Sequence, residues 1–65
     1  MISWKYSTEK FNLWINIFED RAVCVYQPYN EYFQVRTFKL DDYPVFPSDE
    51  EEVYTFIKTH FAKIL

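Results

Sequence analysis

The 65-residue chain contains no glycine and only one cysteine and one histidine. Glycine adopts positive φ freely, so without it Asn and Asp are the residues best suited to left-handed turn positions. We expect Asp20, Asn30 and Asp42 to serve there. Cys24 has no cysteine with which to pair, and one Cys with one His does not make a metal ligand set. We therefore expect no disulfide, no bound metal and no cofactor.

Long apolar segments and an excess of basic charge are also missing. Nothing approaches the ~20 apolar residues of a membrane span, and residues 1–6 contain no apolar run of signal-peptide length. We therefore expect a cytoplasmic protein with a reduced thiol and no membrane partner. Seven Lys and Arg against ten Asp and Glu give a net charge of −3. This balance argues against a broad phosphate-binding surface, which needs clustered cations.

Aromatic residues, in contrast, are abundant: seven Phe, six Tyr and two Trp. The length allows one domain, and a chain of this size buries only about 60% of the surface that its unfolded form exposes. Such a domain needs a rich core or a partner to be stable. A single small core cannot hold all the aromatic side chains. The remainder either pad a small fold or form a binding surface, and composition alone leaves both interpretations open.

Alternation with period two is clearest in residues 11–18, Phe-Asn-Leu-Trp-Ile-Asn-Ile-Phe. This pattern is typical of a β-strand with one face in a core. Its other face mixes amides with large aromatics, which suggests a contact surface. Further alternating or β-branched runs predict strands at about residues 2–6, 22–27 and 32–40. We predict an antiparallel meander of three or four strands, the fourth being an edge strand at residues 2–6.

The register of this sheet depends on whether each loop holds an even or an odd number of residues. We expect a two- or four-residue first loop and a four-residue second loop, Pro28–Glu31, with Pro28 at the first central turn position. The core face then contains Leu13, Ile15, Ile17, Ala22, Cys24, Tyr26, Phe33, Val35 and Thr37. The opposite face contains Asn12, Trp14, Asn16, Phe18, Val23, Val25, Gln27, Tyr32, Gln34, Arg36 and Phe38. An odd loop would invert one strand.

The last third of the chain predicts an irregular segment and then a helix. Two prolines in residues 41–47 forbid regular pairing, and we expect Val45 and Phe46 to pack under the sheet edge. Ser48 and Glu51 match a capping box that opens a helix over about residues 49–64. Its apolar stripe contains Val53, Phe56, Ile57, His60, Phe61 and Ile64, opposite Thr55, Lys58, Thr59 and Lys63.

The predicted fold class is therefore α+β, an antiparallel meander followed by one C-terminal amphipathic helix packed on one sheet face. A helix about 10–12 Å wide covers two to three strands spaced ~4.8 Å apart. One helix cannot also cover the other face of the sheet. That face is where we look for function.

Residues with chemical potential are few, and we expect no enzyme. His60 fits a core-margin histidine better than a catalyst, and Cys24 fits a small buried hydrophobe. A nucleophilic pair of the two would need an orienting group and an oxyanion site. The acids Asp49, Glu50, Glu51 and Glu52 match helix-start electrostatics, although with Asp41 and Asp42 they could also imitate phosphates or bind a cation.

We expect a small non-catalytic protein-interaction module, such as an inhibitor, adaptor or regulatory subunit. Its partner would be a second copy in a homodimer, a larger protein client, or both. The candidate protein-binding residues are Trp14, Phe18, Tyr32, Gln34, Arg36 and Phe38. Trp, Tyr, Phe and Arg are enriched at interface centres. The alternative is a single-strand nucleic-acid-binding module that stacks bases on the same aromatic face, although its cations are too few for strong phosphate attraction.

Overall fold

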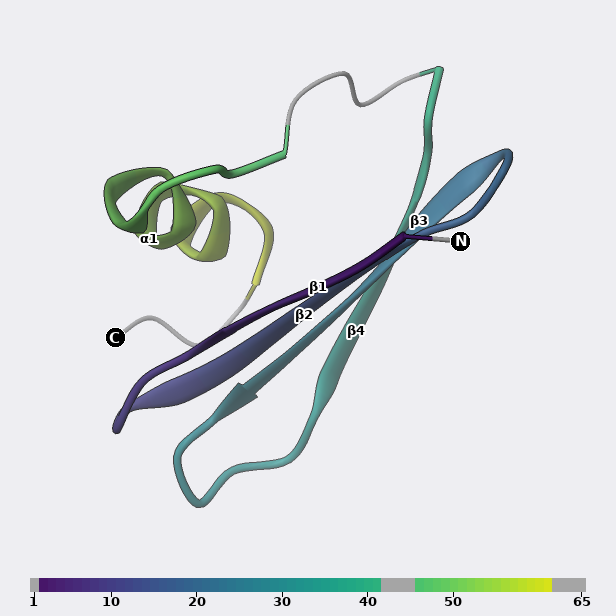
Figure 1. Ribbon diagram of the computed structural model, residues 1–65. Helices are drawn as coiled ribbons and strands as arrows, with labels where there is room; N and C mark the ends of the chain where they lie inside the picture. The colour runs from purple at the N-terminus through teal and green to yellow at the C-terminus, as the bar shows by residue number, and fades with distance from the viewer. Residues whose placement is uncertain (1, 42–45, 62–65) are drawn as a thin grey trace.

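The computed structural model describes residues 2–41 and 46–61. The chain forms β1 (Ile2–Ser7), β2 (Phe11–Ile17), β3 (Arg21–Pro28), β4 (Gln34–Lys39) and α1 (Glu50–His60) (Figure 1). The strands pair antiparallel in the order β1-β2-β3-β4. The predicted α+β meander with a C-terminal helix is confirmed, and the strand at the N-terminus belongs to it.

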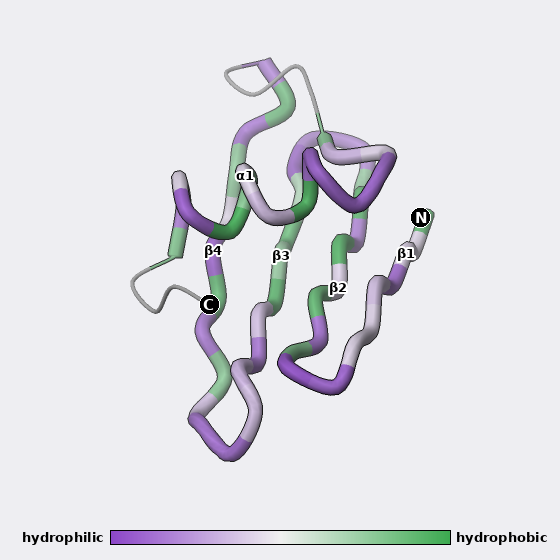
Figure 2. Tube along the Cα trace, turned by 90° about the vertical axis from the view of Figure 1, so that its left-hand side faces the viewer, coloured by the Kyte–Doolittle hydropathy of each residue, from purple (hydrophilic) through white to green (hydrophobic). Residues whose placement is uncertain are grey.

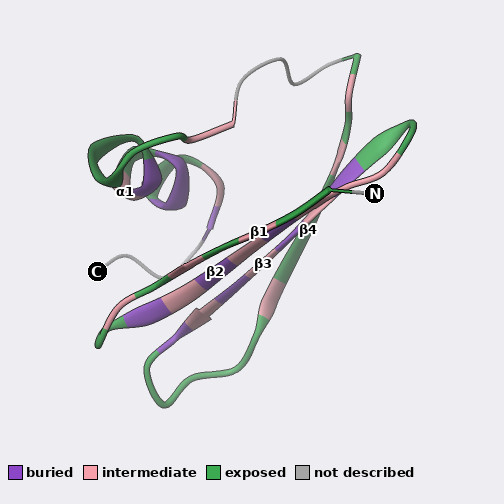
Figure 3. Ribbon diagram, in the orientation of Figure 1, coloured by how far each residue is buried: buried purple, intermediate pink, exposed green. Residues whose placement is uncertain are grey.

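Helix α1 packs over one face of the sheet, and no described element lies on the other face (Figure 1). Among the described residues, each buried strand residue belongs to β2 or β3 (Figure 3). One helix has the width of about two strands, which explains why the edge strands β1 and β4 are only partly covered. Figure 2 shows α1 in front of the sheet, whose two edges are formed by β1 and β4.

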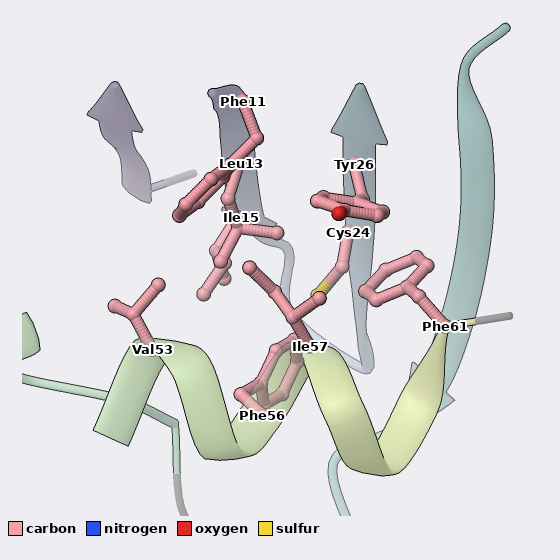
Figure 4. Close-up of a cluster of buried hydrophobic side chains, with 9 residues drawn as sticks. All are labelled: Phe11, Leu13, Ile15, Cys24, Tyr26, Val53, Phe56, Ile57 and Phe61. Atoms are coloured by element: carbon pink, nitrogen blue, oxygen red, sulfur yellow. The ribbon is translucent and has the colours of Figure 1, made fainter. Parts of the chain in front are cut away.

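The core consists of aliphatic and aromatic side chains from β2, β3 and α1 (Figure 4). Its members are Phe11, Leu13, Ile15, Cys24, Tyr26, Val53, Phe56, Ile57 and Phe61. Complete burial of one such apolar side chain contributes about 1.5–3 kcal/mol. The predicted apolar stripe of the helix is confirmed for the members that are described here. Trp4 and Tyr6 of β1 pack against the edge of this core.

The first three strands have the predicted register. Ile15 lies opposite Cys24, and Ile17 lies opposite Ala22, so their side chains share the face that α1 covers. The turn between β2 and β3 is closed by the Phe18 N–H, which donates to the Arg21 carbonyl oxygen at 2.8 Å. Four residues separate Ile17 from Ala22. This even number keeps the apolar side chains of β2 and β3 on the same face of the sheet.

The predicted register of β4 is wrong. Tyr26 lies opposite Gln34, and Ala22 lies opposite Phe38, so an odd number of residues separates the paired positions. Each side chain of β4 therefore lies on the face opposite to the predicted one, an exchange that we call the inversion of β4. Gln34, Arg36 and Phe38 therefore share the face of α1, and Phe33, Val35 and Thr37 do not belong to the core face. The inversion places the Phe38 ring against the rings of Phe46, Phe56 and His60, so a large aromatic side chain is partly buried where a threonine was expected.

The turn between β3 and β4 explains this odd spacing. Pro28 is the last residue of β3 and the first residue of the turn, not its first central residue as predicted, because its carbonyl accepts from the Glu31 N–H at 3.1 Å. Asn30 has a φ of 60°, which confirms its predicted left-handed conformation. Among the described residues it is the only one with positive φ. Asp20 does not need this conformation, and Asp42 lies outside the described residues.

The capping box of α1 is displaced by one residue from its predicted position. Asp49 is the N-cap, and its carboxylate accepts from the Glu52 N–H at 2.9 Å. Glu52 reaches back and accepts from the Ser48 N–H at 2.9 Å and from the Ser48 hydroxyl at 3.1 Å. Ser48 and Glu51 were expected in these two roles. The acids of the first turn suit the positive end of the helix dipole.

The helix also ends earlier than predicted. Phe61 has extended backbone angles, and its N–H donates to the Ile57 carbonyl at 2.9 Å, so the last helical residue is His60 rather than residue 64. Phe61 still reaches the core, where its ring centroid lies 5.0 Å from that of Tyr26. The expectations for Val45, Lys63 and Ile64 fall outside the described residues.

Candidate functional site

The face of the sheet that α1 leaves uncovered is the candidate site, and we call it the open face. It consists of the strand side chains that alternate with the core: Ser3, Lys5, Ser7, Asn12, Trp14, Asn16, Arg21, Val23, Val25, Gln27, Val35, Thr37 and Lys39. The register arranges these residues in rows that cross the strands. An apolar row runs through the middle, between two rows of polar side chains.

The middle row is Lys5, Trp14, Val25 and Val35, each opposite its neighbour on the next strand. The Lys5 ammonium lies 5.3 Å from the centroid of the Trp14 ring, within the range of a cation–π interaction. The Phe33 ring, which precedes β4, meets Trp14 at a centroid distance of 5.9 Å. Phe33 and Val35 are both 59% exposed. The row is thus a preformed apolar strip that stays accessible to solvent.

The two polar rows are held by hydrogen bonds between strands. In one row the Ser3 hydroxyl donates to Asn16 Oδ1 at 3.0 Å, and Asn16 Nδ2 donates to the Val23 carbonyl at 3.4 Å. In the other, the Ser7 hydroxyl donates to Asn12 Oδ1, and Asn12 Nδ2 donates to Gln27 Oε1 at 3.4 Å. These bonds orient the side chains without burying them. The resulting surface has an ordered polar border on both sides of the apolar strip.

Charge is distributed unevenly between the sheet and the rest of the chain. None of the four strands contains Asp or Glu, whereas together they carry Lys5, Arg21, Arg36 and Lys39. Three of these cations belong to the open face, and Arg36 lies on the face of α1. Arg21 pairs with Asp20 of the adjoining turn at 3.1 Å. Within the described part of the chain, Lys5 and Lys39 form no ion pair. The open face is therefore locally positive on an acidic protein.

The structure divides the sequence-predicted site residues between three places. Trp14 lies at the centre of the open face, as predicted. Phe18 lies in the turn after β2, where the Arg21 guanidinium is 4.7 Å from its ring centroid. Tyr32 lies in the turn before β4 and is 92% exposed. The remaining three, Gln34, Arg36 and Phe38, lie on the face of α1 and do not join Trp14.

Sequence reasoning missed Lys5 and Val35 of the apolar strip and Phe33 beside it, and it placed Val25 on this face without naming it as a binding residue. Phe33 and Val35 could have been identified by considering a second loop with an odd number of residues. A shift by one residue exchanges the two faces of β4 and moves both side chains to the open face. The signal for Lys5 was its alternation with Trp4 and Tyr6, which pack against the core edge. In a strand, the residue between two core-facing residues must point to the opposite face.

The groups that could carry chemistry lie on the covered side. Cys24 is fully buried, and burial raises the pKa of its thiol to about 11, so the reactive thiolate is strongly disfavoured. Burial, together with the charge of Arg36, lowers the pKa of His60. The His60 ring is half-buried beside Phe38 and Phe56, at centroid distances of 5.0 and 4.8 Å. This is the predicted core-margin position, packed between aromatic rings.

The acidic residues at the start of α1 have structural partners. Asp49 and Glu52 cap the helix as described above. Burial raises the pKa of the Tyr6 hydroxyl on β1. The Glu50 carboxylate in the first turn of α1 lies near this hydroxyl and raises its pKa further. In the described ranges 2–41 and 46–61, no three His, Cys, Asp or Glu residues are placed so as to hold a metal ion.

Comparison with known proteins adds no relative, because no family model, curated protein or solved structure matches the chain. Over the described residues, α1 falls short of the length and apolar character that crossing a membrane requires.

Proposed function

We propose that the protein is a small non-catalytic protein-interaction module and that the open face is its binding surface. One observation carries the proposal: the solvent-accessible strip of Lys5, Trp14, Val25 and Val35, with Phe33 packed beside Trp14, lies between two hydrogen-bonded polar rows. Interface centres combine exposed aromatic and aliphatic anchors with a polar border in the same way. The strip is also ordered before any partner arrives, which lowers the entropy cost of binding.

The strand residues expected to bind through this surface change with the register. Trp14 remains the central anchor, and Phe18 and Tyr32 remain candidates at the two ends of the sheet. Phe33 and Val35 replace Gln34, Arg36 and Phe38. A client of such a module would be inhibited, recruited or regulated by it, whether that client is a second copy or another protein.

The experiment that tests the proposal is a selection of peptides from a displayed random library against the purified chain. Wild type, Trp14→Ala and Trp4→Ala serve as parallel targets, because the two tryptophans lie on opposite faces of the sheet. We expect binders that wild type and Trp4→Ala retain and that Trp14→Ala loses. A pool that depends on Trp4 and not on Trp14, or that depends on neither, contradicts the proposal.

Single-strand nucleic-acid binding is a second candidate, favoured by the absence of carboxylates from the strands. Base stacking on an aromatic residue contributes about 1–3 kcal/mol per base. The aliphatic neighbours Val25 and Val35, and the contact of Lys5 with the Trp14 ring, leave less room for a row of stacked bases. Fluorescence anisotropy with labelled oligothymidylate tests it: tight binding that Trp14→Ala abolishes makes this the leading function.

A further inference from the structure

We propose that the open face binds an acidic segment of another protein, one that carries apolar side chains between its carboxylates. This inference deepens the proposed function by naming the chemistry of the partner. It rests on the juxtaposition of the Lys5–Trp14–Val25–Val35 strip with Lys5 and Lys39, which form no ion pair within the described residues, on strands that contain no acid.

The charge distribution selects the sign of the partner. In the described residues, the acids occupy the turns, the segment after β4 and the start of α1, so the strands carry positive charge, of which only that of Arg21 is paired with an acid among those residues. Opposite charge on the partner steers the encounter and disfavours wrong partners. Lys39 follows Val35 and Thr37 along β4, on the same face and one row beyond the polar row that borders the apolar strip. A carboxylate there would meet a cation that forms no ion pair with any residue of the ranges 2–41 and 46–61.

The same distribution argues against a second copy as the occupant. A two-fold contact through this surface brings identical patches together. Such an arrangement would bring two faces that carry Lys5, Arg21 and Lys39 together, with no strand carboxylate on either side to pair with them. Asp20, in the turn beside the face, already pairs with Arg21 of the same chain. Like charges across an interface oppose association.

The surface chemistry also favours a peptide over a nucleic acid. Asn12 and Asn16 each use one amide N–H on Gln27 Oε1 and on the Val23 carbonyl, and their Oδ1 atoms accept from Ser7 and Ser3, so they have fewer groups left with which to read base edges. The centre of the strip is aliphatic on two of its four strands, which suits Leu, Ile or Phe side chains better than bases. Carboxylates beside those side chains would form ion pairs with Lys5 and Lys39.

The test uses the peptide pool selected with the intact chain, and the readout is the composition of its Trp14-dependent members. We expect Asp and Glu to be enriched over the starting library, with apolar residues between them. A synthetic member of the pool is then titrated against Lys5→Gln, Lys39→Glu and Lys58→Glu. Lys58 lies exposed on α1 and is the matched control for a change of charge.

We expect Lys39→Glu to weaken the selected peptide about tenfold or more, with Lys58→Glu close to wild type, and the affinity to fall with added salt. Lys39 does not touch Trp14, so its variant keeps the test valid even where Lys5→Gln disturbs the fold. Trp14-dependent peptides that are neutral or basic would overturn the acidic partner and leave the proposed function standing. An absence of Trp14-dependent peptides overturns both. Concentration-dependent dimers, or oligothymidylate that displaces the peptide, would assign the face to a different occupant and overturn the inference.

Discussion

Lys5 and Trp14 face each other on neighbouring strands, with the lysine Nζ 5.3 Å from the centroid of the indole ring. The contact joins an edge strand to a central strand on the side that α1 leaves uncovered. It defines the centre of the open face, where an apolar surface and a positive charge occur together. The functional account follows from that combination.

Replacement of Trp14 should separate binding from folding. Trp14→Ala removes the contacts with Lys5 and Phe33 from a half-exposed position, so we expect the free energy of unfolding to fall by only about 1 kcal/mol. Association with a client should weaken by about 2 kcal/mol or more, the typical loss for an aromatic interface anchor. Urea denaturation measures the first effect and calorimetric titration the second. A variant that fails to fold would show that Trp14 acts as a core residue.

The cap of α1 provides a test of the local structure. Asp49→Ala removes the acceptor for the Glu52 N–H and should cost about 1 kcal/mol of stability. Ser48→Ala should cost less, because the Ser48 backbone N–H still donates to Glu52. The two urea midpoints, measured side by side, give the order of the effects. The reverse order would place the start of the helix at Ser48.

The hydroxyl of Tyr26 is a weak point of the core. The side chain is fully buried, and among the described residues its hydroxyl has no hydrogen-bond partner. A buried unsatisfied polar group costs about 1–3 kcal/mol, so Tyr26→Phe should leave stability unchanged or raise it by about 1 kcal/mol. Tyr29→Phe, at an exposed turn, is the control. Marked destabilisation by Tyr26→Phe alone would reveal a partner for the hydroxyl.

Alkaline pH should destabilise the fold through Cys24. Burial raises the pKa of the thiol from its ordinary 9.0 to about 11. Between these values the unfolded chain has lost the proton that the folded chain still holds, so stability falls as pH rises. The full effect of such a shift is about 2–3 kcal/mol. Burial also raises the pKa of Tyr26, which acts in the same direction.

The measurement is the slope of the unfolding free energy against pH, for wild type and Cys24→Ala. Because the variant lacks the thiol and keeps the tyrosines, its slope above pH 9 should be shallower. Equal slopes would mean that the thiol titrates in the folded protein as it does in the unfolded chain. The slopes are compared rather than the absolute stabilities, since the smaller side chain leaves a cavity.

Much of the fold was predictable from the sequence because its signals are local. Alternation in β2, the β-branched run in β3 and the 3.6-residue apolar period of α1 each depend on neighbouring residues. The face of β4 was not predictable in the same way, since it depends on the parity of a loop. The energetic advantage of placing Phe38 beside Phe56 appears only when strand and helix are brought together.

The candidate site was predictable in its centre and not in its border. Trp14 was assigned to the correct face because β2 alternates without interruption. The loss of Arg36 and the gain of Val35 follow from the same inversion of β4. The sequence also shows that the strands contain no acidic residue. This feature could be recognised only once the strand boundaries were known.

The most direct test of the account uses the indole N–H signals of the two tryptophans in a ¹⁵N correlation spectrum. Trp4 and Trp14 lie on opposite faces of the sheet, so each signal reports on one face. They are assigned with Trp4→Phe and Trp14→Phe variants. On titration with a selected partner, the account predicts that the Trp14 signal shifts while the Trp4 signal stays in place. A shift of Trp4 with Trp14 unmoved would show that the partner binds the side of α1, and would contradict it.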